Sequence, residues 1–349
     1  MLLVLLACYG CSRQEVEAGH NATTLSIGMA APEGSLDPQL RVPAVLLSLE
    51  PLLTISTDGR ATPNLAERWE RSSDGVAWRF DLRKGMTFHD STPVTADRVV
   101  ESLSSAVRQP GTLALAPSFQ QVSSIVADSP TSFTIRLNRP SALLLSDLSY
   151  VNITHGPQDR AAGTGPFIVE ISDGKRIVMR RFDGYRDGTP AIDRLELNAF
   201  PTVRNAWTAL MRGEIDFLYE VGPDAAEFVD GESSVQTFTF LKPYSLTLGF
   251  NLRHPVLRSR EVRQAINRAI NRGAIVQGGF RGRGQPGDGP IWPGHWAFSR
   301  AVPTYEYNRE AAVLGFAAAG HGRLKPTAGR MPSRLRFNCL VFTPLERVG

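Results

Sequence analysis

The sequence is poor in cysteine and histidine, which limits the chemistry that it can support. Only three cysteines and six histidines occur among 349 residues. Cys8 and Cys11 lie close to the N-terminus, and Cys339 is alone in the rest of the chain. This usage excludes a disulfide framework. The histidines have no metal-ligand spacing, and His-Glu-x-x-His and Gly-x-Ser-x-Gly are both missing. The sequence therefore predicts no metal site, no cofactor and no enzyme of these classes.

The chain also lacks a long run of one charge and an apolar run of membrane-spanning length. Its formal net charge is +4, and the arginines are scattered through segments of mixed sign, which does not favour a nucleic-acid partner. A transmembrane helix needs about 20 apolar residues, more than the N-terminal run provides. Hydrophobic residues make up 42% of the chain, as in folded globular proteins. The length predicts about two or three folded units.

Residues 1–22 are typical of a targeting segment. A short apolar run leads into small residues and cysteine, as in bacterial lipoprotein signals. The basic residues that usually precede such a run are missing. We therefore expect that a few residues upstream of Met1 are missing from this sequence. Cys11, between Gly10 and Ser12, is the favoured lipidation site, and Cys8 stays open. A cleaved secretory signal with incidental cysteines, or a wrongly assigned start codon, is the alternative. With either kind of signal the mature protein lies in the periplasm or cell envelope, and a lipid anchor would tie it to the membrane.

Alternating strand patterns and helical stripes predict an α/β protein. In the helix expected at 202–212, apolar residues follow one stripe, and Gly213 stands where a glycine commonly ends a helix. Asp74 and Gly75 predict a tight turn before a half-buried strand. The sequence predicts further strands at 23–29, 78–82, 133–137, 177–182, 195–199, 215–219, 246–252 and 335–341, and further helices at 95–107, 262–270 and 308–319.

Four stretches resemble the peptide/nickel-type family of bacterial extracellular solute-binding proteins, family 5, in the order and approximate spacing of that family. They are Leu-Ala-Glu-Arg-Trp-Glu at 65–70 with Phe-Asp-Leu-Arg-Lys-Gly-Met-Thr-Phe-His-Asp at 80–90, Gly-Thr-Gly-Pro-Phe at 163–167 with Leu-Met-Arg-Gly-Glu-Ile-Asp at 210–216, Leu-Gly-Phe-Asn at 248–251, and Pro-Ile-Trp-Pro-Gly at 290–294 with Trp296. One departure is Ser91, where the family usually has glycine. The resemblance extends from about residue 24 to the end of the chain.

The resemblance implies a two-lobed periplasmic-binding-protein architecture of type II and of the α/β class. The core of lobe 1 is expected to comprise 23–45 and 164–245, with an inserted subdomain at 46–163. Lobe 2 is expected to begin at 246 and to run to 349. Because the family continues beyond the matched part, we expect this second lobe to be incomplete.

The same resemblance implies a receptor without enzymatic activity. It would bind oligopeptides, dipeptides or a related small solute outside the cytoplasm and deliver them to an ABC permease and its ATPase subunits, as a monomer when full length. Two alternatives stay open: a receptor that presents ligand to a membrane sensor and, more distantly, a peptide hydrolase. Neighbouring genes for a permease or for a sensor would distinguish the first two.

Candidate ligand-binding residues lie at the end of the first strand, at the crossover between lobes and in a tryptophan-containing loop. They are Met29, Ala30, Ala31, Tyr244, Phe250, Asn251, Trp292 and Trp296. Core packing competes with ligand stacking for the tryptophans, and an asparagine after a strand equally suits a turn. His89, inside a family motif, is interpreted as structural and not as an acid or base.

Overall fold

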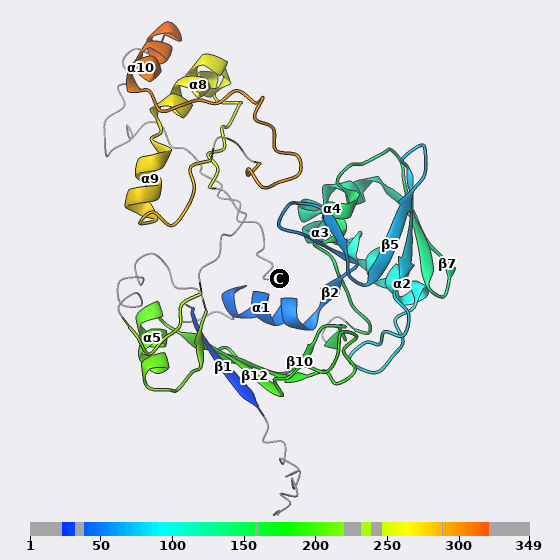
Figure 1. Cartoon of the computed structure of the whole chain (residues 1–349). Coiled ribbons are helices and arrows are strands. Elements are labelled where there is room, and N and C mark those ends of the chain that lie inside the picture. Colours follow the sequence, from blue (N-terminus) through cyan, green and yellow to red (C-terminus); the bar gives the residue numbers. More distant parts are fainter. Residues whose placement is uncertain are drawn as a thin grey trace, which may run out of the picture.

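The computed structural model describes residues 23–31, 38–157, 160–219, 232–238, 246–287, 289 and 291–320. The predictions made for Cys8, Cys11, Tyr244 and the strand at 335–341 lie outside these residues. Figure 1 shows a main sheet, an inserted region with a sheet of its own, and a group of helices that follows residue 246. The predicted α/β class is confirmed.

The main sheet has five strands in the order β10-β11-β12-β1-β13. β1 runs parallel to β12 and β13, whereas β10, β11 and β12 are antiparallel neighbours. The bounds are β1 (Thr24–Ala30), β10 (Phe167–Ser172), β11 (Arg176–Arg181), β12 (Arg194–Phe200) and β13 (Phe217–Leu218). The strands expected near 23–29, 177–182, 195–199 and 215–219 are therefore confirmed.

Two helices pack against this sheet. α1 (Pro38–Ser48) packs against β10, β11, β12 and β1, and apolar side chains of the helix and these strands form a core of Met29, Leu40, Ala44, Phe167, Ile177, Met179, Leu195 and Leu197. α5 (Val203–Met211) packs next to β1. The Thr202 hydroxyl accepts a hydrogen bond from the Asn205 amide at 3.2 Å, which satisfies one free donor at the start of α5. The predicted helix at 202–212 is confirmed.

The inserted region follows α1 in the chain, and its strands, between Glu50 and Ile153, pair among themselves. β2 (Glu50–Pro51) pairs with β9 (Asn152–Ile153), and β3 (Leu53–Ile55) forms a hairpin with β4 (Ala61–Pro63). A four-stranded sheet has the order β5-β6-β8-β7, with β5 (Ala66–Arg71), β6 (Ala77–Leu82), β8 (Ser132–Leu137) and β7 (Val122–Ser129). The accompanying helices are α2 (Ala96–Ala106), α3 (Pro110–Leu115) and α4 (Leu144–Leu148), with a 3-10 turn at Pro117–Gln121.

Alternation in β6 fixes which face of this sheet is buried. Trp78, Phe80 and Leu82 point into the core, and Arg79 on the opposite face is exposed. The rings of Phe80 and Phe133 stack with centroids 5.2 Å apart. The predicted half-buried strand at 78–82 is therefore confirmed. Thr95 precedes α2 as predicted, but its side chain makes no capping hydrogen bond.

The helical segment, residues 246–320, contains α7 (Pro255–Arg258), α8 (Arg260–Ala269), α9 (Arg272–Gly279) and α10 (Arg309–Ala318). Leu257, Val262, Ala265 and Phe316 form its small core. The predicted helices at 262–270 and 308–319 are confirmed, and Asn308 caps α10 by accepting a hydrogen bond from the Ala311 amide at 2.8 Å. The predicted strand at 246–252 is wrong, because this stretch has no strand conformation and pairs with no strand in the part of the chain that the structure describes. α9 was not expected.

The stacked pair in the inserted region gives a first prediction. We expect Phe80→Ala to lower the free energy of unfolding by about 3–5 kcal/mol, because Phe80 is fully buried and its loss leaves a cavity. The matched control is Val126→Ala on β7, where the side chain is 55% exposed and we expect a change within about 0.5 kcal/mol. Urea unfolding of both variants measures the difference. Equal effects would contradict the assignment of this core.

Candidate ligand-binding site

Three parallel strands of the main sheet end at one edge. β1 ends at Ala30, β12 at Phe200 and β13 at Leu218, and Ala30 lies opposite Phe200 in the strand register. The Ala31 amide donates to the Phe200 carbonyl at 2.7 Å, and the Tyr219 amide donates to the Gly28 carbonyl at 2.9 Å. In open α/β sheets, ligands bind outside the carboxyl ends of such strands. This edge is therefore the first candidate for a binding surface.

The three residues predicted at this edge differ in what they can offer a ligand. The Met29 side chain is buried in the core beneath α1, so it can reach a ligand only through its main chain. Ala31 is also buried, and its amide is already bonded to Phe200. Ala30 is half-buried at the end of the strand. The side chains of Met29, Ala30 and Ala31 at this edge are apolar, and two of them are small. Such an edge suits a ligand held mainly by shape and by main-chain atoms.

The residues predicted at the crossover have structural partners in the helical segment. Phe250 packs against the core formed by Leu257 and its neighbours. The Asn251 side chain accepts a hydrogen bond from the Arg253 amide at 3.0 Å, and its carbonyl accepts one from the His254 amide at 3.0 Å. This is the turn chemistry that the sequence offered as the alternative for Asn251.

The two predicted tryptophans lie together, but against the inserted region. The Trp292 indole N–H donates to the Thr57 carbonyl, and the Trp296 indole N–H donates to the Gly59 carbonyl, both at 3.1 Å. The predicted site residues therefore occupy three different neighbourhoods: the edge of the main sheet, the start of the helical segment, and the β3–β4 turn. As ligand contacts, all of them remain predictions.

A buried ion pair that the sequence did not point out joins the main sheet to the inserted region. Nη1 of Arg186 lies 2.7 Å from each carboxylate oxygen of Glu50, and Nη2 donates to Oδ1 of Asn64 at 2.7 Å. The Thr164 hydroxyl donates to Glu50 at 2.8 Å, and Nδ2 of the Asn64 side chain donates to the Pro51 carbonyl at 2.8 Å. Such complete pairing is what a buried charge requires.

The electrostatics of this junction keep its groups in fixed protonation states. Burial raises the pKa of Tyr185, and the negative charge of Glu50 adds to the effect, so that the pKa reaches about 12. Burial alone would lower the pKa of Arg186, but the hydrogen bond and the charge of Glu50 raise it above its ordinary value. The phenol therefore stays neutral and the guanidinium charged at every pH at which the protein would work.

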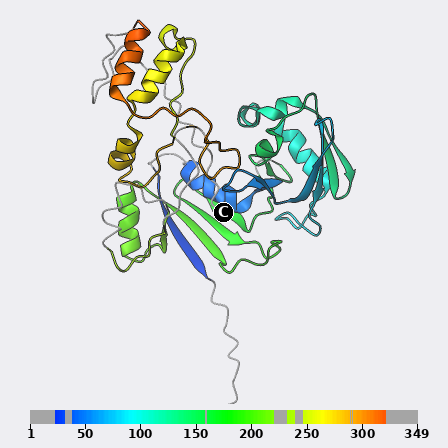
Figure 2. The same ribbon diagram turned by 45° about the horizontal axis from the view of Figure 1, so that its top comes forward.

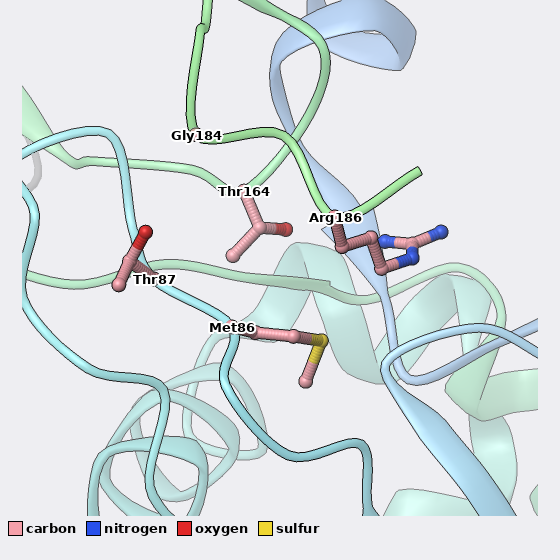
Figure 3. A pocket seen from close by; sticks show the side chains of 5 residues that line it. All are labelled: Met86, Thr87, Thr164, Gly184 and Arg186. Carbon is pink, nitrogen blue, oxygen red and sulfur yellow. The ribbon is translucent and has the colours of Figure 1, made fainter. Parts of the chain in front are cut away.

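A small cavity borders the junction. It is lined by Met86, Thr87, Thr164, Gly184 and Arg186 and holds about 10 Å³ of solvent space, roughly enough for one water molecule. Figure 3 shows that it lies between the loop of the inserted region at 86–87 and the two segments that carry Thr164 and Gly184 to Arg186. A peptide or chelate does not fit in this space, so the junction is structural.

The Gly-Thr-Gly motif at 163–165 has a steric reason at the same junction. A Cβ atom at Gly163 would overlap the Ser48 carbonyl, and one at Gly165 would crowd the Leu47 carbonyl. The Gly165 amide donates to the Ser48 carbonyl at 3.0 Å. Only glycine lets the chain pass this close to the end of α1, and the passage places Thr164 against Glu50.

His89 is held in a structural position, as predicted from its place in the family motif. Its Nε2 lies 2.9 Å from the Gly165 carbonyl, and its ring meets Phe182 edge-on, with centroids 5.1 Å apart. Burial lowers the pKa of His89, and the hydrogen bond to the Gly165 carbonyl opposes this only in part. A neutral imidazole can donate a hydrogen bond to this carbonyl and stay buried without an acidic partner.

A metal-binding cluster and a membrane-spanning helix are both missing from the part of the chain that the structure describes. No group of three or more histidine, cysteine, aspartate or glutamate side chains there could hold a metal ion. Within the same residues, no helix has the length and apolar character needed to cross a bilayer.

Comparison with known proteins identifies the family. A family model described as bacterial extracellular solute-binding proteins, family 5, matches residues 60–341. The chain belongs to this family. The resemblance seen in the four sequence motifs is thereby confirmed, and the family consists of binding proteins rather than enzymes.

Curated relatives in family 5 differ in the ligands that their descriptions state. A probable di/tripeptide-binding protein from Pseudomonas aeruginosa is 29% identical over 73% of this chain and 55% of its own length. Heme-binding protein A from Haemophilus influenzae is 26% identical over 74% of this chain and 54% of its own length. The chain thus spans about half the length of the curated relatives that it matches.

A solved structure supports the fold. NikA from Brucella suis, in complex with Fe(III)-EDTA, superposes with a TM-score of 0.70 at 24% identity and covers 85% of this chain and 64% of its own. The structures found are two-lobed periplasmic binding proteins of type II, so the predicted fold class is confirmed.

The buried junction gives a second prediction. We expect Glu50→Ala to lower the free energy of unfolding by about 3–5 kcal/mol, because it removes the buried carboxylate that pairs with the mostly buried Arg186 guanidinium and leaves the exposed Asp187 as its ion-pair partner. The matched control is Glu214→Ala, which removes a pair to Arg212 that is more than half exposed on both sides and should cost about 1 kcal/mol or less. Urea unfolding measures both. Comparable losses would contradict the role of the junction.

His89 gives a third prediction, on pH. Because its pKa is lowered in the folded protein, the unfolded chain binds a proton first as the pH falls through about 6.5. The contribution of neutral His89 to stability is therefore fully present above about pH 6.5 and decreases below it. Between pH 7.5 and 5.5, we expect the wild type to lose more stability than His89→Gln, which keeps a donor for Gly165. His254→Gln, at an exposed histidine, is the control. Identical pH profiles for wild type and His89→Gln would refute this.

Proposed function

We propose that this protein is the substrate-binding component of an ABC importer. It captures a small solute between its two lobes, outside the cytoplasm, and delivers it to a membrane permease that is driven by ATPase subunits. The observation that carries the proposal is the family match together with the edge at which three parallel strands end. Lobe closure on a ligand at such an edge is a known mode of binding.

We further propose that the ligand is a dipeptide or oligopeptide. The relative from Pseudomonas aeruginosa is described as a probable di/tripeptide-binding protein. The Ala30 to Ala31 edge presents small side chains and no charge, which would let an extended main chain approach closely. Ala30 and Ala31 are the strongest candidates for this contact, and Tyr244, Phe250, Asn251, Trp292 and Trp296 remain weaker ones.

The cellular setting belongs to the same proposal. We place the mature protein in the periplasm or cell envelope, as a monomer when full length. The cysteine-containing segment at 1–22 supports a lipid anchor at Cys11 or, in its place, at Cys8.

A thermal-shift screen on the full-length protein tests the ligand class. Di- and tripeptides, longer peptides, nickel and iron chelates, and hemin are each added to the same preparation, because a ligand that binds only the folded state raises the melting temperature. We expect the peptides to give the largest concentration-dependent shifts. Stabilisation by hemin or by a chelate, with none by peptides, would refute peptide binding and leave the family role intact.

Two variants on one strand locate the site, which is the fourth prediction. We expect Ala30→Glu to weaken binding of the best peptide from the screen at least about tenfold, because it would bury an unpaired carboxylate against the ligand. The matched control is Thr24→Glu, at the exposed start of the same strand, which should bind normally. Titration calorimetry gives the dissociation constants. Normal binding by Ala30→Glu would exclude this edge.

A further inference from the structure

A loop of the helical segment is seated on the tip of a hairpin in the inserted region. The loop comprises residues 291–298, and the tip is the β3–β4 turn, residues 56–60. In Figures 1 and 2 this orange loop extends from the helices toward the blue hairpin of the inserted region. More than 230 residues of sequence separate the partners. The contact therefore joins the helical segment to the inserted region, each of which has a core of its own.

The contact is made through three successive carbonyls of the turn. The Thr57 carbonyl accepts the Trp292 indole N–H at 3.1 Å, and the Gly59 carbonyl accepts the Trp296 indole N–H at 3.1 Å. Between them, the Asp58 carbonyl accepts the backbone N–H of Trp296 at 2.9 Å. The turn is held in shape from within, because the Asp58 carboxylate pairs with Arg60 and accepts the Ser56 hydroxyl.

The imidazole ring of His295 completes the contact between the loop and the turn. His295 lies edge-on to Trp292, with centroids 4.6 Å apart, and stacks on Trp296 at 5.7 Å. Its imidazole covers Gly59 so closely that a Cβ atom there would overlap it. Gly59 also has a φ of +81°, a conformation that glycine adopts without strain. The turn thus offers the loop three carbonyl acceptors and, at Gly59, the space that His295 occupies.

This contact has the character of a releasable interface rather than of a core. Trp296 remains 59% exposed, and the bonds are to main-chain carbonyls, which water can replace. The helical segment begins at 246–251, and among the described residues this stretch pairs with no strand. Small polar interfaces between units of one chain permit relative motion.

We propose that residues 291–298 are a latch that fastens the second lobe to the inserted region and limits how far the cleft opens. The inserted region then has a mechanical role: its β3–β4 turn is the fixed point on which the latch closes. The latch acts without ligand, so this inference does not depend on which solute the protein binds.

Two glycine variants of the full-length protein test the latch, by hydrogen–deuterium exchange measured with mass spectrometry and without added ligand. Gly59→Ala puts a methyl group where His295 lies. Gly85→Ala is the matched control, because Gly85 has a similar φ of +76° in the same region but nothing within 4 Å of the added Cβ. Both variants carry the same backbone strain, and only the first disturbs the loop.

We expect amides in peptides covering 291–298 to exchange about tenfold faster in Gly59→Ala, as expected for the loss of at least one net hydrogen bond, and at the wild-type rate in Gly85→Ala. The radius of gyration from small-angle scattering should rise in Gly59→Ala alone. Exchange in 291–298 that is the same in all three proteins would overturn the proposal.

A second variant keeps the test decisive if Gly59→Ala fails to fold. Trp292→Phe combined with Trp296→Phe retains aromatic rings in the loop but removes both indole donors, without touching the inserted region. Faster exchange in 291–298, with normal protection in β5 and β6, would support the latch. Unchanged exchange in this double variant would refute it.

Discussion

The ion pair between Glu50 and Arg186 is the constraint on which the arrangement of the lobe depends. Glu50 begins β2 at the entrance to the inserted region, and Arg186 comes from the loop between two strands of the main sheet. Their bond, at 2.7 Å and shared with Asn64 and Thr164, fixes one body against the other. A charge buried without such partners would be strongly destabilising. The main sheet and the inserted region are therefore held in the one arrangement that keeps this pair together.

The position of the hairpin tip follows from the same bond. β3 starts at Leu53, three residues after Glu50, and its turn carries the carbonyls that receive the tryptophan loop. The ion pair thus orients the surface on which the latch closes. The proposed ligand contact lies at the ends of β1 and β12, at Ala30 and Phe200. Rigidity at the junction and mobility at the latch are what a binding protein with closing lobes requires.

Much of the fold could be predicted from the sequence, because it depends on local patterns. The alternation of Trp78, Phe80 and Leu82 identified β6, and the apolar stripe at 202–212 that ends at Gly213 identified α5. The alternation of Leu246, Leu248 and Phe250 was misleading, since a strand also needs a partner strand, and periodicity does not show whether one is present. α9 was missed because its eight residues, Arg272–Gly279, include three glycines and little apolar pattern.

The contacts within the site were harder to foresee, because they join residues far apart in sequence. Glu50, a single acid inside the apolar run at 46–53, was a signal that could have indicated a buried charge, but nothing local pointed to Arg186 as its partner. For the tryptophans, the sequence offered stacking on a ligand or packing in a core. The structure instead uses their indole N–H groups on a turn, and Asn251 adopted the turn role that had been its alternative.

A crystal structure of the full-length protein, grown with the ligand that stabilises it most, tests the central claim most directly. The account predicts ligand density at the carboxyl ends of β1 and β12, in contact with the main chain of Ala30 and Ala31, while the Glu50–Arg186 pair stays intact. Density at another surface, or a ligand that enters by displacing Arg186 from Glu50, would contradict it.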